Sequence, residues 1–175
     1  MLFRSRLRDF GRKADFTKEK VNINKPVQDV LDIIGRQLRL QNIDIQLNID
    51  ENIPPILAHR NRIEQVIFNL ITNARDAINQ KLEAGGPSTD NRIMIETHAL
   101  NDQVMLSVSD TGIGMDMILK ERIFEAFFTT KKMGEGMGLG LSITSGIVED
   151  YGGKINIENF EGQGTRFCLS FPAAI

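Results

Sequence analysis

Segments with helical periodicity alternate along this chain with segments whose apolar residues recur at every second position. Helical spacing is found in residues 25–40, 61–82 and 141–151, and strand-like alternation in residues 43–49, 92–100, 103–110, 154–159 and 165–171. An amphipathic helix and an alternating strand each have one apolar side to bury. We therefore expect an α/β fold in which helices cover one face of a mixed sheet, without internal repeats.

Composition agrees with one globular domain. The chain has 175 residues, of which 41% are hydrophobic and 25% charged, enough for a sizeable core. Its apolar stretches fall short of the roughly 18 residues that indicate a membrane span, and no charged-then-apolar leader opens the sequence. Cys168 is the only cysteine and no Cys/His cluster has zinc-ligand spacing, so we expect a reducing, cytoplasmic setting and no structural metal.

The first twenty residues differ in charge from the rest. They hold seven basic and three acidic residues, which gives +4, whereas the whole chain carries −2. Such a basic end is compatible with contact to nucleic acid or lipid. However, alternating four- and three-residue steps separate the apolar residues Phe3, Leu7, Phe10 and Ala14. We prefer the interpretation that residues 1–20 are the end of a longer coiled-coil or bundle helix.

Two amides and an acid share one side of the long predicted helix over 61–82. Asn69, Asn73 and Asp76 lie within roughly 60° of one another, next to an apolar stripe. Asparagine is a weak helix former, so two at this spacing favour a ligand, and an amide oxygen suits Mg²⁺. A hydrogen-bonded polar helix face without a ligand is the alternative.

Glycine-rich stretches follow two of the predicted elements. "DTGIGM" (110–115) places Asp110 and two glycines directly after a strand, and "GEGMGLGL" (134–141) precedes the last helix. Exposed backbone N–H groups at a helix N-terminus are able to hold phosphate, although a flexible loop explains such glycines equally well. Neither the P-loop nor the Rossmann fingerprint fits this spacing.

The order of five motifs is specific. "NLITNARDA", "DTGIGM", "IFEAFFTTK", "GEGMGLGL" and "GQGTRF" resemble the N, G1, F, G2 and G3 boxes of the histidine-kinase catalytic, ATP-binding domain. That family shares its nucleotide fold with DNA gyrase, a heat-shock chaperone and the mismatch-repair ATPases. The resemblance covers residues 20–175, and "FFTTK" with the acid in "NARDA" is similar to the nitrogen-regulation branch. It implies a two-layer α/β (α+β) sandwich with a mixed, mainly antiparallel sheet, helices on one face and an ATP lid.

The resemblance also implies roles for individual residues, with ATP and Mg²⁺ as cofactors. Asp110 would accept a hydrogen bond from the adenine amino group, Asn69 would bind Mg²⁺, and Asn73 would contact phosphate or a metal-bound water. Asp76 stands where several kinase branches carry a basic residue, which leaves its role open. The implied nucleotide contacts further include Gly112, Ile113, Gly114, Phe128, Thr129, Thr130, Lys131, Lys132, Gly136, Met137, Gly138, Leu139, Gly140, Leu141 and Thr165.

A mobile lid over residues 115–137 is part of the same resemblance. Its apolar anchor would be formed by Phe124, Phe127 and Phe128, and Lys131 or Lys132 would reach the γ-phosphate, Lys131 being our catalytic candidate. Ala126 replaces a proline that is common in the motif, which would loosen the lid. We expect bound ATP to slow hydrogen exchange in this segment.

Position 69 separates a kinase from an ATPase. The gyrase-type and chaperone relatives have a glutamate there as a general base, whereas this chain has Asn69; Glu64 lies on another side of the helix. A neutral imidazole needs no such base, so we expect phosphotransfer to histidine within two-component signalling. The alternatives are an ATP-hydrolysing conformational switch and a nucleotide-binding module without transfer.

The resemblance implies partners that this chain does not contain. The phosphoacceptor histidine would lie on an upstream dimerisation domain, and a response-regulator receiver domain would accept the phosphoryl group next. His59 and His98 lack the phosphoacceptor context, so we expect both to be structural or surface residues. We expect domain boundaries of 1–20 and 21–175 and a monomeric, cytoplasmic fragment without nucleic-acid binding. The sensed signal and the membrane attachment of the parent protein are left open.

Overall fold

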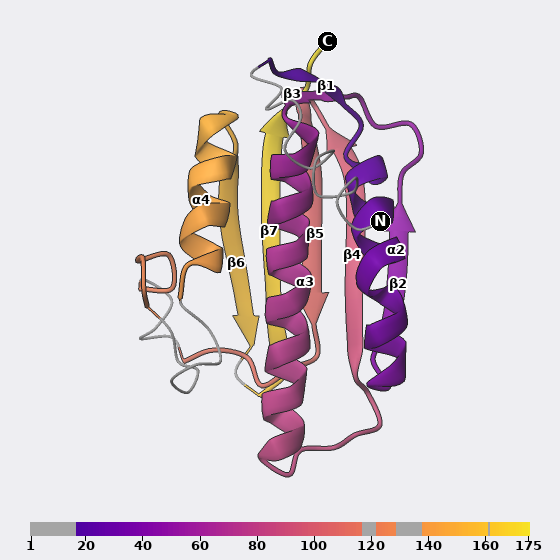
Figure 1. Cartoon of the computed structure of the whole chain (residues 1–175), viewed down its shortest axis with the longest axis vertical. Helices are drawn as coiled ribbons and strands as arrows, with labels where there is room; N and C mark the ends of the chain where they lie inside the picture. The colour runs from indigo at the N-terminus through magenta and orange to yellow at the C-terminus, as the bar shows by residue number, and fades with distance from the viewer. Residues whose placement is uncertain (1–16, 117–121, 129–137, 161) are drawn as a thin grey trace, which may run out of the picture.

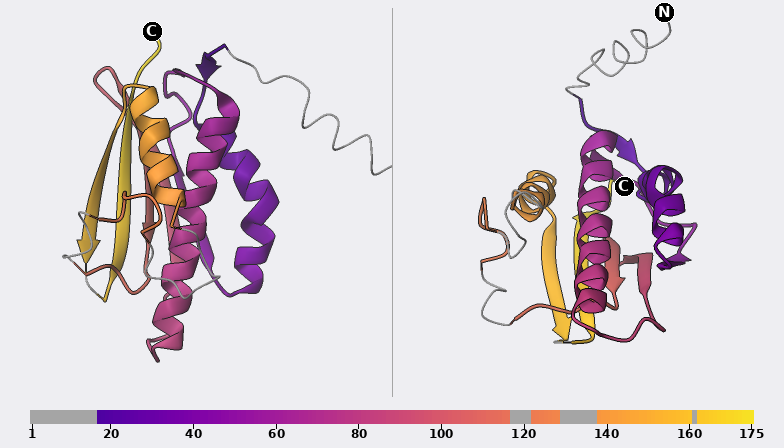
Figure 2. Two further views of the ribbon diagram at one scale, coloured as in Figure 1. Left: turned by 60° about the vertical axis from the view of Figure 1, so that its left-hand side comes forward. Right: turned by 60° about the horizontal axis from the view of Figure 1, so that its bottom comes forward.

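The computed structural model describes residues 17–116, 122–128, 138–160 and 162–175. Three helices lie in one layer and a five-stranded sheet lies behind them (Figure 1). The view from the side shows that these three helices all cover the same face of this sheet (Figure 2). The predicted two-layer sandwich is therefore confirmed.

The sheet is mixed and mainly antiparallel, as the family resemblance implies. Its strand order is β2-β4-β5-β7-β6, with the bounds β2 Asp44–Ile49, β4 Arg92–Leu100, β5 Gln103–Asp110, β6 Lys154–Phe160 and β7 Gly164–Pro172. Only the pairing of β2 with β4 is parallel in this sheet. The register brings the end of β5 to the start of β7, where Ser109 pairs with Arg166. Segments far apart in the sequence therefore meet beside Asp110.

The helices fall close to their predicted positions. Their bounds are α2 Asn24–Leu40, α3 Arg60–Glu83 and α4 Gly140–Asp150. The central helix α3 turns a continuous apolar stripe toward the sheet, made of Ile63, Val66, Ile67, Leu70, Ile71, Ala74 and Ile78. This stripe packs on inward-facing residues such as Ile95 and Leu106, so burial on one side of α3 leaves its polar side beside α4.

A small two-stranded sheet, absent from the sequence-based expectation, lies at one end of the domain. Strand β1 (Glu19–Val21) pairs antiparallel with β3 (Ile56–Ala58). The predicted domain boundary after residue 20 therefore falls inside β1. Strands of three residues show too little alternation to be recognised in the sequence. Of the predicted helical stub over residues 1–20, residues 1–16 lie outside the described part of the chain, and Glu19 and Lys20 belong to β1 instead of a helix.

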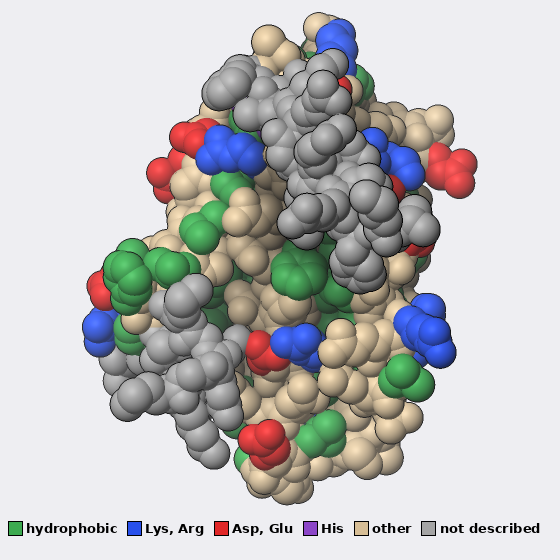
Figure 3. All heavy atoms as spheres, in the orientation of Figure 1, with side chains coloured by type: hydrophobic (Ala, Val, Ile, Leu, Met, Phe, Trp, Pro, Cys, Tyr) green, Lys and Arg blue, Asp and Glu red, His purple; other side chains and the backbone are tan. Residues whose placement is uncertain are grey.

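Charges of both signs are interspersed over the face that carries the helices (Figure 3). Each of the three helices in this layer carries a substantially exposed apolar side chain, among them Ile33 on α2 at 76%, Phe68 on α3 at 42% and Ile143 on α4 at 38%. None of the helices in the described ranges combines the length and the apolar character that a membrane crossing requires.

Candidate functional site

Asp110, the last residue of β5, is the centre of the first half of the site. Its Oδ1 accepts the backbone N–H of Gly112 at 2.8 Å. Burial raises the pKa of Asp110 to about 6, although the N–H groups of Gly112 and Thr165 and the ammonium of Lys81 lower it. At neutral pH the carboxylate is therefore largely ionised while mostly removed from water, which makes it a strong acceptor for an N–H donor.

Two glycines let backbone segments approach this carboxylate closely. A Cβ at Gly112 would lie 2.6 Å from the carbonyl carbon of Ala77 in α3, and a Cβ at Gly164 would overlap the carbonyl oxygen of Asp110. Gly164 also has a φ of +113°, which side chains rarely adopt. Next in the chain, the Ile113 N–H donates to the Ala77 carbonyl at 3.1 Å. The loop after β5 is thus held between α3 and β7, and it brings together Asp110, Gly112 and Thr165.

The end of β6 holds the exit of this loop through Asn159, a residue that sequence reasoning missed. The Met115 N–H donates to Asn159 Oδ1 at 2.7 Å, and Asn159 Nδ2 donates to the Met115 carbonyl at 2.6 Å. The Thr165 hydroxyl donates to the same Oδ1 at 3.2 Å. Asn159 therefore connects the G1 and G3 motifs. The spacing of residues along the sequence does not predict this contact.

Asn69 is the centre of the second half of the site, where α3 meets α4. Its Nδ2 donates to the Gly140 carbonyl at 3.1 Å and lies 3.4 Å from the hydroxyl of Thr144, which is fully buried. These contacts use the amide nitrogen, and no donor from the described ranges is bonded to Oδ1. The half-buried side chain thus presents a neutral oxygen that suits a hard cation.

Asn73 and Asp76 follow on the same helix. Asn73 is half-buried one turn beyond Asn69, and Asp76 Oδ1 accepts both Nε and Nη2 of Arg75, at 2.9 Å and 2.7 Å. The contact between α3 and the Asp110 loop at Ala77 is eight residues beyond Asn69, about 12 Å along the helix axis. One helix therefore separates the two halves of the site by about the length of an elongated ligand.

The phenylalanine cluster differs from the expectation. Phe124 and Phe128 pack partly buried on the core, and the guanidinium of Arg122 lies 4.6 Å from the Phe128 ring centre. Phe127, which we expected in the apolar anchor, is 75% exposed and has a φ of +65°. Its N–H donates to the Gly138 carbonyl at 3.0 Å, so backbone pairing with the G2 motif turns this side chain outward.

The G2 residues lie at the start of α4. Gly138 has a φ of +65°, and a Cβ there would overlap the Phe128 carbonyl; Leu139 precedes the first turn of α4 and Leu141 packs on the core. The expected contacts at Thr129, Thr130, Lys131, Lys132, Gly136 and Met137, with most of the lid, lie outside the described residues. Across the ranges that are described, no three His, Cys, Asp or Glu side chains form a metal-binding group.

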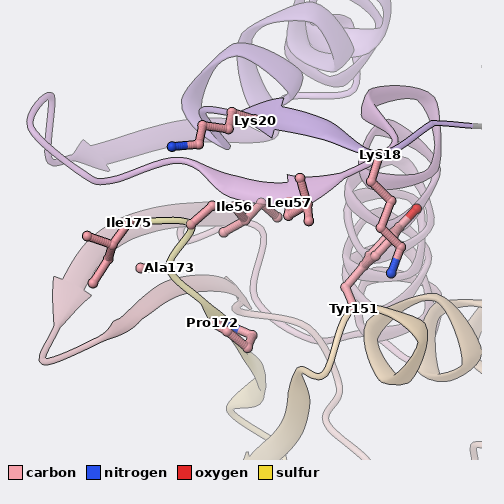
Figure 4. A pocket seen from close by; sticks show the side chains of 9 residues that line it. Lys18, Lys20, Ile56, Leu57, Tyr151, Pro172, Ala173 and Ile175 are labelled. Atoms are coloured by element: carbon pink, nitrogen blue, oxygen red, sulfur yellow. The ribbon is translucent and has the colours of Figure 1, made fainter.

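A pocket of about 540 Å³ lies at the other end of β7 from Gly164 and Asp110. Its lining includes Lys18, Lys20, Tyr151 and Pro172 (Figure 4). Tyr151 Oη lies 2.8 Å from His59 Nδ1, which confirms a structural place for this histidine, and His98 is exposed on β4. The pocket shares no residue with the two halves of the site.

Comparisons with known proteins point to one family. Residues 58–175 match the sequence model described as "Histidine kinase-, DNA gyrase B-, and HSP90-like ATPase". Sporulation kinase E of Bacillus subtilis is 34% identical over 155 residues, which are 88% of this chain and 20% of that protein. The chain spans between about a fifth and a third of the first curated relatives that it matches.

Solved structures agree. The nucleotide-free catalytic domain of the histidine kinase ThkA superposes with a TM-score of 0.75 at 36% identity, covering 89% of this chain and 95% of that one. ThkA in complex with the response regulator protein TrrA gives a TM-score of 0.71 at 31% identity, over 97% of this chain and 46% of that one.

Proposed function

The chain belongs to the family of histidine kinase-, DNA gyrase B- and HSP90-like ATPases, as an ATP-binding catalytic domain of the sensor histidine kinase type, and we propose that it transfers the γ-phosphoryl group of ATP to a histidine on another domain. The observation that carries this proposal is the buried carboxylate of Asp110, enclosed by backbone and separated along α3 from the amide of Asn69. The Asp110 carboxylate suits the adenine ring, and the Asn69 amide suits a phosphate with its cation.

Adenine recognition is assigned to Asp110. The 6-amino group of adenine would donate to the carboxylate oxygen that Gly112 leaves accessible, while the loop of Gly112, Ile113 and Gly114 would line the base. Guanine carries a carbonyl oxygen at that position, and two acceptors facing each other repel. The same carboxylate would therefore favour ATP over GTP.

Phosphate and Mg²⁺ are assigned to the other half of the site. Asn69 would offer its Oδ1 to the cation, and Asn73 would hold a phosphate oxygen or a metal-bound water. The backbone N–H groups at Leu139, Gly140 and Leu141 begin α4, where a helix terminus favours an anion. Bound Mg²⁺ would supply charge stabilisation for the transferring group. We assign Thr129, Thr130, Lys131, Lys132, Gly136 and Met137 to further contacts with the nucleotide, Lys131 being the candidate that reaches the γ-phosphate, whereas Thr165 belongs to the base half beside Asp110.

We infer that the acceptor is a histidine because the side chain at position 69, proposed to lie beside the phosphate, is an amide and not a general base. This residue is Asn69, and Glu64, five residues earlier in α3, accepts from Arg60 Nε at 3.0 Å. A neutral imidazole nitrogen is already nucleophilic, so the N–P bond forms as the bond from phosphorus to the ADP oxygen breaks, without prior removal of a proton. Water, in contrast, would need a base. Asn69 thus favours transfer over hydrolysis.

The partners in this proposal are a dimerisation and phosphoacceptor domain upstream of residue 21 and a receiver domain. The ThkA structure with a response regulator supports the receiver domain as a partner, because 97% of this chain matches part of that kinase. The similarity to the nitrogen-regulation branch remains a prediction.

The test measures the fate of labelled phosphate. [γ-³²P]ATP with Mg²⁺ would be incubated with the 175-residue chain alone, and then with the parent protein's upstream helical segment added. We expect acid-labile label only on the added segment. Acid-labile label on His59 or His98 of the chain alone would contradict the proposal, as would rapid phosphate release without acceptor, which indicates an ATPase switch. Binding without transfer would indicate a nucleotide-binding module.

A further inference from the structure

Lys81, in the last turn of α3, contacts the loop that carries Asp110. Its Nζ donates to the Thr111 carbonyl at 2.6 Å and to the Asp90 carbonyl at 3.1 Å. This side chain is half-buried, and it joins the end of α3 to the loops after β5 and before β4. A lysine at a helix C-terminus is ordinarily explained by the helix dipole, but this ammonium binds carbonyls of two other segments.

The peptide that Lys81 holds is fixed on several sides. The Thr111 N–H donates to the Arg92 carbonyl at 3.1 Å, and the Arg92 N–H donates to the Thr111 hydroxyl at 2.9 Å. The same hydroxyl donates to the Asp90 carbonyl at 2.7 Å. Thr111 stands between Asp110 and Gly112, so its position sets the direction of both.

We propose that Lys81 is a positioning residue of the adenine site: its ammonium fixes the Thr111 carbonyl and places a positive charge near the neighbouring Asp110 carboxylate. The inference rests on the proposed function, since it assigns to Lys81 a part in recognising the base. No sequence motif contains this residue, because Lys81 follows the N box by several positions.

The electrostatic half of the argument concerns the charges that face Asp110. Burial raises the pKa of this carboxyl to about 6, the N–H groups of Gly112 and Thr165 lower it, and the Lys81 ammonium lowers it by a smaller amount. The nearby Asp90 and Arg92 side chains pair with each other at 3.5 Å and are well exposed, so solvent screens them. Loss of the Lys81 cation would therefore raise the pKa of Asp110 further and leave less of the accepting carboxylate near pH 6.

The experiment compares Lys81→Met, which keeps the aliphatic stem, with Lys81→Arg, which keeps the cation. Lys154→Met is the matched control, because Lys154 is exposed on β6 at the opposite end of the sheet. Carbon-13 NMR would follow the Asp110 carboxyl titration in the unliganded domain. Calorimetry with ATP–Mg²⁺ at pH 6 and pH 8 would give the affinities, and adenosine, which has no phosphate to titrate, would isolate the base end.

We expect Lys81→Met to raise the pKa of Asp110 and to weaken ATP roughly fivefold at pH 6 but only roughly twofold at pH 8. Adenosine should show the same pH trend, and Lys81→Arg should leave the pKa of Asp110 and the ATP affinity close to those of wild type. An unchanged Asp110 titration in a folded Lys81→Met domain would overturn the inference. So would a loss of affinity that is equal at the two pH values, which a merely structural lysine would give. A wild-type domain that does not bind ATP would overturn the proposed function itself.

Discussion

The base half and the phosphate half of the site are built in different ways. Around Asp110, backbone meets backbone: an added Cβ at Gly112 or Gly164 would come closer to another segment than any real contact. At Gly140, beside Asn69, an added Cβ would lie 3.7 Å from the nearest side-chain atom, an ordinary contact. The base half is enclosed by tertiary packing, whereas around Asn69 and Gly140 the phosphate half relies on side-chain amides and a helix terminus; its tight backbone contact lies just before α4, where Gly138 meets the Phe128 carbonyl.

This difference matches what each half has to recognise. Selecting one base from another requires an acceptor at a fixed place, and rigid backbone provides it. Phosphate and a hydrated cation are bound mainly by charge and dipoles, which tolerate more freedom. Substitutions in the base half should therefore affect stability and affinity together, whereas substitutions in the phosphate half should affect transfer alone.

The largest expected effect is on transfer. Asn69→Ala removes the oxygen proposed to bind Mg²⁺, so the rate of phosphotransfer to the added acceptor segment should fall roughly a thousandfold. Affinity for adenosine should change little, because base recognition lies on another segment. Asn61→Ala, at the exposed start of α3, is the control. Near-normal transfer by Asn69→Ala at ordinary Mg²⁺ concentration would remove Asn69 from the metal site.

The comparison of glycines comes next. Gly164→Ala should lower the free energy of unfolding by about 3 kcal/mol, because the new Cβ overlaps the Asp110 carbonyl at a φ of +113°. Gly140→Ala, in the first turn of α4, should change it by less than about 1 kcal/mol. Urea denaturation of both variants measures the two values. Equal losses would show that the two halves are packed alike.

Asp110→Asn should change both stability and binding, in opposite directions. The pKa of Asp110 is raised to about 6 in the folded domain, so ionisation of this group opposes folding above that pH, and its stabilising contribution is present only at lower pH. The unliganded variant should be more stable than wild type at pH 7.5 by up to about 3 kcal/mol, with ATP affinity lower by about 1.5–3 kcal/mol.

Denaturation at several pH values and calorimetric titration test this pair of effects. Wild type should gain stability relative to the variant as the pH falls from about 7 to about 4. Asp102→Asn, in the exposed turn between β4 and β5, is the control and should show neither effect. ATP affinity equal to wild type in Asp110→Asn would exclude this carboxylate from the site.

The smallest expected effect concerns the exit of the loop. Asn159→Ala removes both hydrogen bonds to Met115, and it should destabilise the domain by about 1–2 kcal/mol and speed hydrogen exchange at the Met115 amide. Asn156→Ala, on the exposed side of the same strand, should leave that amide protected. Faster exchange in both variants would point to general loosening of β6 instead.

The sequence by itself determined the elements and the order of the motifs. Residues 92–100 and 103–110 were expected as strands and are β4 and β5, and the helix expected over 61–82 is α3 at Arg60–Glu83. Each of these segments buries one side, so its apolar residues recur with the period of a helix or a strand, and this spacing is visible in the local sequence. The residues proposed for the base and the cation were also visible, because Asp110 and Asn69 stand in recognisable motifs.

The tertiary structure alone decided which segments meet. The pairing of β1 with β3, the contact of Asn159 with Met115, the reach of Lys81 to Thr111 and the outward turn of Phe127 join positions between 11 and 44 residues apart. Nothing in local periodicity reports such a contact, because it depends on the path of the chain between its two ends. The sequence motifs thus identify the residues proposed for the site, and the tertiary structure determines which residues they contact.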